Sequence, residues 1–205
     1  MVVIIDYGRG NLHSVSKAVE CLGYEAVVSS DEQVILAADG AILPGVGAFG
    51  DAMAELRATG LDGTVLRFAA SGKPLLGICL GMQLLFSRSE EHGNHNGLAL
   101  LPGEVVRFQG GYKVPHMGWN RLAFEQESPL FKGLTEGHVY FVHSYHVQLE
   151  QASDLLASTD YHQPVTAIVG RGNIFGMQFH PEKSGELGMQ LLGNFMELCG
   201  AGTGL

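Results

Sequence analysis

An apolar run that ends at a cysteine, with a glycine two residues to each side, constrains this chain most. The run covers residues 74–83, PLLGICLGMQ. Small residues at those two positions permit the strained strand–turn–helix that lifts a nucleophile above a sheet, as in the Gly-x-Ser-x-Gly elbow. A helix beginning there would favour a thiolate at Cys79. The alternative is a buried cysteine that ends a core strand, because free cysteine is among the most buried residue types.

Short apolar runs alternate with helical patterns through the first half of the chain. We expect strands over residues 2–6, 26–28, 41–43 and 75–78, and helices over residues 12–22, 48–57 and 64–70. Such alternation predicts a largely parallel sheet that is covered by helices on both faces. Ligands of these sheets bind beyond the carboxyl ends of the strands, where Cys79 and residues 44–47 would lie.

The second half is richer in β-patterns. We expect strands over residues 104–108, 119–124, 139–149, 155–159, 165–169 and 173–178, and an amphipathic helix over residues 187–198. The predicted fold class is α/β, with a mostly parallel open sheet flanked by helices and additional antiparallel strands in the C-terminal half. A length of 205 residues predicts one domain over residues 1–205. The segment 90–96 is the expected exposed loop, and we expect little of the function to depend on it.

The composition of the chain limits the kinds of partner that we expect it to bind. The formal charge of −9, from 21 acidic and 12 basic residues, argues against nucleic acid or an anionic membrane surface. No segment reaches the apolar length of a membrane span. Cys21, Cys79 and Cys199 cannot all pair and show no CxxC spacing, which favours a reducing compartment and argues against a structural zinc site. We therefore expect a cytoplasmic protein whose partner is a small molecule or another protein.

A second motif supplies the base that a nucleophilic thiol needs. The segment 176–183 reads GMQFHPEK. Residues two apart on an extended segment face the same side, so Glu182 can approach the imidazole of His180. A thiol, a base and an orienting carboxylate together form a triad, and triads assemble in space rather than along the chain. Cys79, His180 and Glu182 are therefore the predicted catalytic residues.

These residues resemble the class I, or triad, glutamine amidotransferases, whose glutaminase domains carry a Gly-x-Cys-x-Gly elbow and a late His-Pro-Glu. Further segments are similar to the glutaminase subunits of imidazole glycerol phosphate synthases: PGVGAF at 44–49, KVPHMGWN at 113–120, VYFVHSY at 139–145 and HPEKS at 180–184. The resemblance runs in order along nearly the whole chain. The segment 115–120 is its most specific part, since the elbow alone would not separate this family from other glutaminases.

The resemblance implies a thioester route from L-glutamine to glutamate and ammonia, with no cofactor. The oxyanion would bind the Leu80 N–H and a backbone amide of Gly45, Val46 or Gly47, whose glycines allow a close approach. Glutamine itself would be held by Gly47, which belongs to both sets, and by Gln83, His143, Ser144 and Tyr145. In the family the ammonia passes to a separate (β/α)8-barrel cyclase subunit that makes imidazole glycerol phosphate and an aminoimidazole carboxamide ribotide.

The chain is too short to contain such a barrel as well, so the resemblance implies a heterodimer. The expected docking face combines the first strand-to-helix turn with later positions: Arg9, Gly10, Asn11, His116, Trp119, Asn120, Tyr140 and Lys183. Trp119 could instead be a core anchor, and Lys183 a solvated surface charge. Phe141 is expected in the core.

Other interpretations of the same residues remain open. Residues 8–11, GRGN, could cradle a phosphate, although the glycine pattern is too short for a dinucleotide fingerprint. A metal site is not expected, because His143 and His146 would face opposite sides of one strand and His92 and His95 lack suitable companions. The rival function classes are a different cysteine hydrolase and a catalytically silent regulatory subunit. The segment 115–120 argues against the first, and the intact triad against the second.

Overall fold

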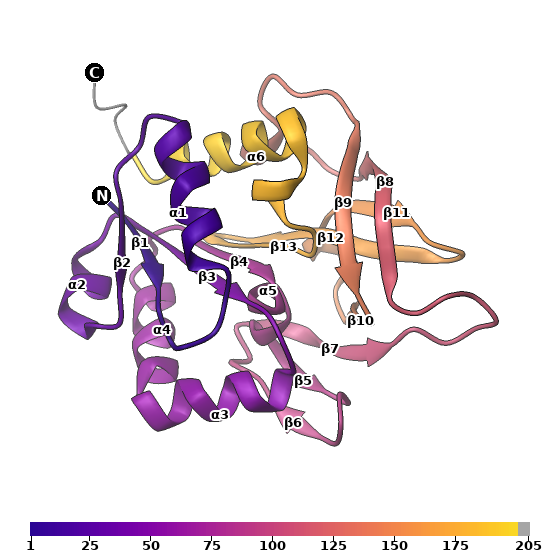
Figure 1. The fold of residues 1–205 in the computed structure, drawn as a ribbon, viewed down its shortest axis with the longest axis horizontal. Helices are drawn as coiled ribbons and strands as arrows, with labels where there is room; N and C mark the ends of the chain where they lie inside the picture. The colour runs from indigo at the N-terminus through magenta and orange to yellow at the C-terminus, as the bar shows by residue number, and fades with distance from the viewer. Residues whose placement is uncertain (201–205) are drawn as a thin grey trace.

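The computed structural model describes residues 1–200, and a nine-stranded sheet forms its centre (Figure 1). Its strand order is β2-β1-β3-β4-β13-β12-β11-β8-β9. The strands from β2 to β13 pair in parallel, and those from β13 to β9 pair antiparallel. The predicted fold class is therefore confirmed, including the antiparallel extension in the C-terminal half.

The strands of this sheet are β1 (Val2–Ile5), β2 (Ala26–Ser29), β3 (Gly40–Gly45), β4 (Leu75–Cys79), β8 (His116–Phe124), β9 (His138–His143), β11 (Leu155–Asp160), β12 (Pro164–Arg171) and β13 (Ile174–Met177). A second, four-stranded sheet has the order β10-β7-β5-β6. Its strands are β5 (Phe86–Ser89), β6 (His95–Asn96), β7 (Leu101–Arg107) and β10 (Tyr145–Leu149).

Helices cover both faces of the large sheet and enclose two apolar cores. The helices are α1 (Leu12–Cys21), α2 (Glu32–Ala37), α3 (Phe49–Thr59), α4 (Leu61–Ala70), α5 (Leu80–Leu84) and α6 (Gly185–Leu198), with short 3-10 turns at η1 (Pro129–Phe131), η2 (Ala152–Asp154) and η3 (Pro181–Lys183). One core packs α2, α3 and α4 against the sheet, and the other packs α1 and α6. The continuously apolar sequences of β1 and β4 follow from burial on both faces.

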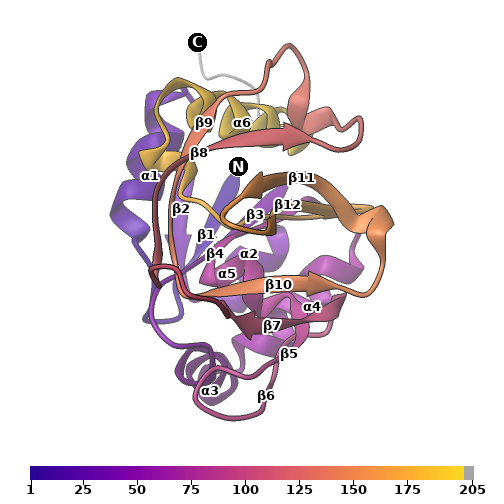
Figure 2. The same cartoon turned by 90° about the vertical axis from the view of Figure 1, so that its right-hand side faces the viewer.

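One predicted strand is in fact two. The expected strand over residues 139–149 is broken at Ser144, and its halves, β9 and β10, belong to different sheets. Figure 2 shows β10 lying beside β7, away from β8 and β9. The break has a consequence for the histidines. His143 and His146 do not face opposite sides of one strand, because both rings pack against Phe108, at centroid distances of 5.1 and 4.6 Å.

The remaining expected elements are found within a few residues of their predicted bounds, whereas β5 and β6 were not predicted. Both are short and partly polar, so their sequences lack a clear alternating pattern. Within residues 1–200, no helix is long and apolar enough to cross a membrane. The expectation of a single domain over residues 1–205 stays a prediction, and residues 201–205 lie outside the described part of the chain.

Candidate active site

Cys79 stands at the carboxyl end of β4 in a strained elbow. It adopts φ 55° and ψ −114°, a conformation that non-glycine residues rarely adopt, and α5 begins at the next residue. The two flanking glycines are required by packing. A Cβ atom on Gly77 would lie 2.6 Å from the Gly81 carbonyl oxygen, and one on Gly81 would overlap the carbonyl oxygen of Leu43. The Gly-x-Cys-x-Gly spacing is therefore the packing condition for the turn.

His180 and Glu182 follow β13, the strand that pairs with β4 and so ends at the same edge of the sheet. The Nδ1 atom of His180 lies 2.9 Å from Oε1 of Glu182, and both side chains are almost fully buried. The Ser184 hydroxyl donates to the His180 carbonyl oxygen (2.6 Å) and accepts from the Tyr140 N–H (3.0 Å), which ties the turn to β9. The imidazole is thus held in one orientation.

The charge state of His180 follows from these neighbours. Burial alone lowers the pKa of this imidazole, but hydrogen bonds to Cys79 and Glu182 and their negative charges outweigh burial and raise the pKa to about 9. A protonated imidazole at neutral pH stabilises a thiolate beside it. The second carboxylate oxygen of Glu182, Oε2, is buried and has no hydrogen-bond partner. His180 is therefore the group within residues 1–200 that balances this carboxylate most directly.

A cavity of about 300 Å³ opens beside the sulfur of Cys79. It is lined by Val46, Gly47, Cys79, Leu80, Gln83, Glu91, Val142, His143, Ser144, Tyr145 and His180. The structure thus brings together all but two of the predicted catalytic, oxyanion and substrate-binding residues around one cavity of amino-acid size. Glu182 lies behind His180 rather than on the cavity wall.

Gly45 is the other exception. It is the last residue of β3, opposite Cys79 in the ladder, and does not line the cavity. A Cβ atom there would lie 2.8 Å from both the Gly81 N–H nitrogen and the Tyr7 hydroxyl oxygen. Gly45 therefore serves close packing under the elbow, and the predicted amide donors that face the cavity reduce to Val46, Gly47 and Leu80.

Gln83 forms part of the cavity wall. Its Nε2 donates to the Tyr145 carbonyl oxygen (3.1 Å) and to Oε1 of Gln178 (3.0 Å). Both amide protons are thereby used within the protein. The Oε1 atom of Gln83 is left to face a ligand.

Glu91 is the cavity residue that the sequence did not predict. It lies in the segment 90–96, for which little functional importance is expected, yet the structure places Glu91 on the wall of the cavity. Its Oε2 accepts a hydrogen bond from the N–H of Phe49 (2.8 Å) at the start of α3. A carboxylate in a loop gives no periodic signal, so only the fold reveals its position.

An exposed apolar patch lies on β8, near the active-site cavity. Met117 and Trp119 are 54% and 55% exposed, which is unusual for large apolar side chains. Tyr140 packs beside Trp119 with a centroid distance of 6.0 Å. Trp119 is therefore not a core anchor, whereas Phe141 is fully buried, as expected.

The other expected docking positions differ in their exposure. Arg9, Gly10, Asn11, Asn120, Tyr140 and Lys183 are all at least partly exposed. The Asn11 side chain also caps α1 by accepting from the Ser14 N–H. His116 is 0% exposed, so the expectation that it touches a partner directly is corrected: its side chain points into the protein.

Residues 8–10 also line a separate cavity of about 510 Å³ with Val46, Gly47 and Glu55. The Glu55 carboxylate lies on the wall of this cavity and would oppose a phosphate. Among residues 1–200, no three His, Cys, Asp or Glu side chains are grouped to hold a metal ion.

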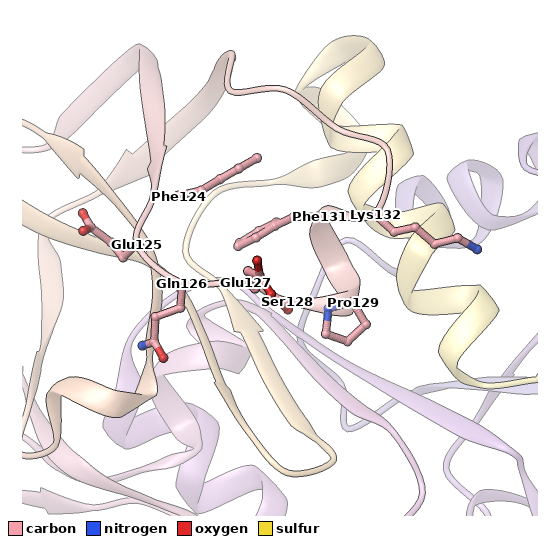
Figure 3. Close-up of a pocket in the computed structure, with 8 residues that line it drawn as sticks. All are labelled: Phe124, Glu125, Gln126, Glu127, Ser128, Pro129, Phe131 and Lys132. Carbon is pink, nitrogen blue, oxygen red and sulfur yellow. The ribbon is translucent and has the colours of Figure 1, made fainter.

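A larger cavity, of about 730 Å³, lies away from Cys79 between the end of β8 and η1. Figure 3 shows Phe124 and Phe131 with their rings side by side, and Lys132 pointing away from them. The rings are stacked at a centroid distance of 4.0 Å. The walls of this cavity come from one continuous segment, residues 124–132, and none of the predicted catalytic residues lines it.

A family model described as class-I glutamine amidotransferase matches residues 3–198, and the chain belongs to that family. The relatives narrow the identification. Imidazole glycerol phosphate synthase subunit HisH from Geobacillus kaustophilus is 56% identical over 211 residues, covering 100% of both proteins. The protein of the same name from Desulfitobacterium hafniense is 55% identical over 196 residues, 95% of this chain and 93% of its own. The chain falls among these HisH glutaminase subunits.

Solved structures show the same fold at lower identity. One described as a glutamine amidotransferase has a TM-score of 0.78 at 23% identity and covers 98% of this chain and 100% of its own. PurLQS from Thermotoga maritima has a TM-score of 0.75 at 20% identity, covering 96% and 97%. The overall fold that contains the elbow and the parallel sheet is therefore shared with proteins of low sequence identity.

Proposed function

We propose that Cys79 is the nucleophile that hydrolyses L-glutamine and that the chain delivers the ammonia to a synthase subunit. The observation that carries the proposal is the position of Cys79 on a strained elbow, facing an amino-acid-sized cavity that His180 of the buried His180–Glu182 pair also lines. The relatives named as subunits of imidazole glycerol phosphate synthase support the second part.

The reaction follows from the geometry in two stages. The Cys79 thiolate attacks the carboxamide carbon of glutamine, and the Leu80 N–H together with an amide of Val46 or Gly47 stabilises the oxyanion. The His180 imidazolium gives its proton to the departing amine, so ammonia leaves and a thioester remains. His180, now neutral, takes a proton from water, whose hydroxide attacks the thioester and releases glutamate and the thiolate. Glu182 stays ionised and orients the imidazole throughout.

The cavity also provides groups for the amino-acid end of glutamine. Glu91 Oε2 is engaged with Phe49, which leaves Oε1 to accept from the α-ammonium group, together with Oε1 of Gln83. Backbone groups of His143, Ser144 and Tyr145 also line the cavity and are suited to the α-carboxylate. The neutral backbone groups would bind the α-carboxylate, and the anionic Glu91 would bind the α-ammonium group. Together they would favour an α-amino acid over an amide that lacks these two groups.

The ammonia needs a protected route, because at neutral pH free ammonia is mostly protonated and no longer nucleophilic. We infer that the partner is a (β/α)8-barrel cyclase that uses the ammonia to make imidazole glycerol phosphate in histidine biosynthesis, in the cytoplasm. The proposed docking face is centred on the exposed Met117 and Trp119 of β8. We assign the remaining docking candidates, Arg9, Asn11, Asn120, Tyr140 and Lys183, to the same face.

The decisive experiment compares the wild type with Cys79→Ala, each combined with the cyclase subunit, and follows glutamate release and imidazole glycerol phosphate formation. We expect the variant to lose glutamine-dependent activity completely while synthesis with added ammonium continues at the wild-type rate. Cys21→Ala, at an exposed cysteine, is the matched control and should retain both activities. Loss of the ammonium-dependent activity in Cys79→Ala would instead assign Cys79 a structural role. Retained glutamine hydrolysis would remove it from the mechanism.

A further inference from the structure

Two buried histidines form a direct pair between the docking strand and the glutamine cavity. His116 opens β8 and His143 ends β9, and the two residues are opposite each other in the antiparallel ladder. Nδ1 of His116 lies 2.9 Å from Nε2 of His143. In Figure 1 these strands run side by side, with β10 beginning near the end of β9. The pair therefore lies at the junction of the two sheets.

Each end of the pair contacts an oxygen that can only accept a hydrogen bond. Nδ1 of His143 lies 2.8 Å from the Tyr145 carbonyl oxygen, in the cavity wall. Nε2 of His116 lies 2.8 Å from Oδ1 of Asn120, on the docking strand. The orientation of the Asn120 amide is fixed, because its Nδ2 donates to the Asp160 carbonyl oxygen (2.9 Å).

These three contacts need three protons, but two neutral imidazoles carry only two. Burial lowers the pKa of His143 to about 3 and also lowers the pKa of His116, so the pair is neutral at physiological pH. One contact must then lack its proton. Two neutral arrangements keep the bond between the rings: in the first, His143 Nδ1 donates to Tyr145, and in the second, His116 Nε2 donates to Asn120.

The rings themselves are fixed, so a change of state moves protons rather than side chains. Phe141 and Tyr161 stack on the His116 ring at centroid distances of 4.8 and 3.9 Å, each tilted by 20°. Addition of a proton at His116 Nε2, transfer of the shared proton to His143 Nε2 and loss of the His143 Nδ1 proton convert the first state into the second. Water supplies the first proton and accepts the last, so the pair carries two protons in both states.

We propose that the His116–His143 pair is a two-state positioning element that links docking at β8 to the order of the glutamine cavity. In the first state the Tyr145 carbonyl is held from two sides, by His143 Nδ1 and by Gln83 Nε2. In the second state only Gln83 holds it. A docked partner that supplies a donor to the half-buried Asn120 amide oxygen releases His116 and favours the first state. The proposal rests on the proposed function and specifies how the same site is regulated.

Two variants of His116 separate its nitrogen atoms. His116→Asn places an amide nitrogen near the position of Nδ1, donates to His143 Nε2 and so fixes the first state. His116→Gln reaches toward Asn120 in place of Nε2 and removes the Nδ1 atom that accepts from His143 Nε2 in the second state, without supplying the donor that fixes the first. For the isolated chain, we expect kcat/KM for glutamine to rise about three- to tenfold in His116→Asn, as one hydrogen bond allows, and to rise by less in His116→Gln, which supplies no donor to His143. The cyclase subunit should stimulate His116→Asn less than it stimulates the wild type. The ratio of activity with the subunit to activity without it should fall by the same factor by which the basal activity of the variant rises.

The ¹⁵N shifts of the two imidazoles report the tautomers independently of activity. In the free wild-type chain we expect the His143 Nδ1 signal of an unprotonated nitrogen, and a protonated Nδ1 both in His116→Asn and after addition of the cyclase. An unchanged His143 tautomer in all three samples would overturn the proposal, as would equal kinetic changes in the two variants. An inactive wild-type complex would instead count against the proposed function, while the tautomer measurement would still decide the state of the pair.

Discussion

The two sides of the active-site cavity are built in different ways. The Cys79 side is fixed by backbone packing, since Gly77, Gly81 and Gly45 lie so close to neighbouring main-chain atoms that no side chain fits. The other side, residues 142–145 of the cavity wall, is held by side-chain hydrogen bonds from Gln83 and His143. Backbone packing allows one arrangement, whereas hydrogen bonds between neutral groups can be exchanged. The nucleophile is thus rigid and the substrate wall adjustable.

The largest expected effect tests the rigid side. In Gly81→Ala the new Cβ atom would overlap the Leu43 carbonyl oxygen, a backbone atom that cannot move without shifting β3. We expect a loss of at least about 4 kcal/mol in unfolding free energy, a large part of the 5–15 kcal/mol typical of a domain. Urea denaturation followed by circular dichroism measures it.

The matched control is Gly63→Ala, inside α4, where the nearest atom to a new Cβ is the flexible Arg67 guanidinium at 3.4 Å. Alanine is the better helix former, so this variant should gain about 0.5–1 kcal/mol. Similar stabilities of the two variants would show that the elbow tolerates a side chain, and the contrast between the two cavity sides would fail.

The second effect concerns the buried carboxylate behind His180. Glu182→Gln keeps the shape but removes the negative charge that stabilises the imidazolium, and it leaves a buried amide group without a partner. We expect kcat for glutamine hydrolysis to fall by about 10²- to 10⁴-fold, by analogy with loss of the orienting carboxylate in other triads. Glu186→Gln, on the exposed face of α6, is the control and should leave kcat unchanged. A fall of less than threefold in Glu182→Gln would reject the orienting role.

The elbow and the His-x-Glu pair could be predicted from the sequence because local rules determine them. A glycine two residues from Cys79 on each side, and a carboxylate two residues after His180, fix short-range geometry. The parallel strands follow similarly from buried apolar runs.

The resemblance predicts His143, Ser144 and Tyr145 at the site, but local rules could not predict how the adjustable wall is built. Its properties depend on which strands pair: the break at Ser144, the burial of His116 and the position of Glu91 all arise from contacts between segments far apart in the chain. A periodic pattern over residues 139–149 gives no sign that its halves enter different sheets. The segments whose roles depend on tertiary pairing are thus those that the sequence describes least well.

A third, smaller effect tests the docking face next to the adjustable wall. Trp119→Ala removes an indole that is 55% exposed and packs beside Tyr140. Exposed tryptophans at interface centres often contribute about 2 kcal/mol, so we expect the Kd for the cyclase subunit to rise about 30-fold. Isothermal titration calorimetry measures it. Leu66→Ala, at a 40% exposed apolar residue of α4, is the control and should not change the Kd. Equal effects of the two variants would place the partner elsewhere.

A last effect is the pH dependence of stability, which arises from the rigid side. The pKa of His180 is raised from its ordinary value of 6.5 to about 9, so the folded protein holds this proton more tightly than the unfolded chain does. The resulting stabilisation is complete below pH 6.5 and is lost as the pH rises toward and past 9. Urea unfolding of the wild type and of Cys79→Ala across this range measures it.

The variant should lose less stability over the same window, because Cys79 supplies part of the interaction that raises the pKa of His180. Identical pH profiles would mean that Glu182 alone holds the proton and that the sulfur is not paired with the imidazolium in the resting protein. A steeper profile in the wild type would instead show that the thiolate–imidazolium pair is formed before glutamine arrives. In that case the chemistry of the rigid side is complete at rest, and control by a partner must act through the adjustable wall.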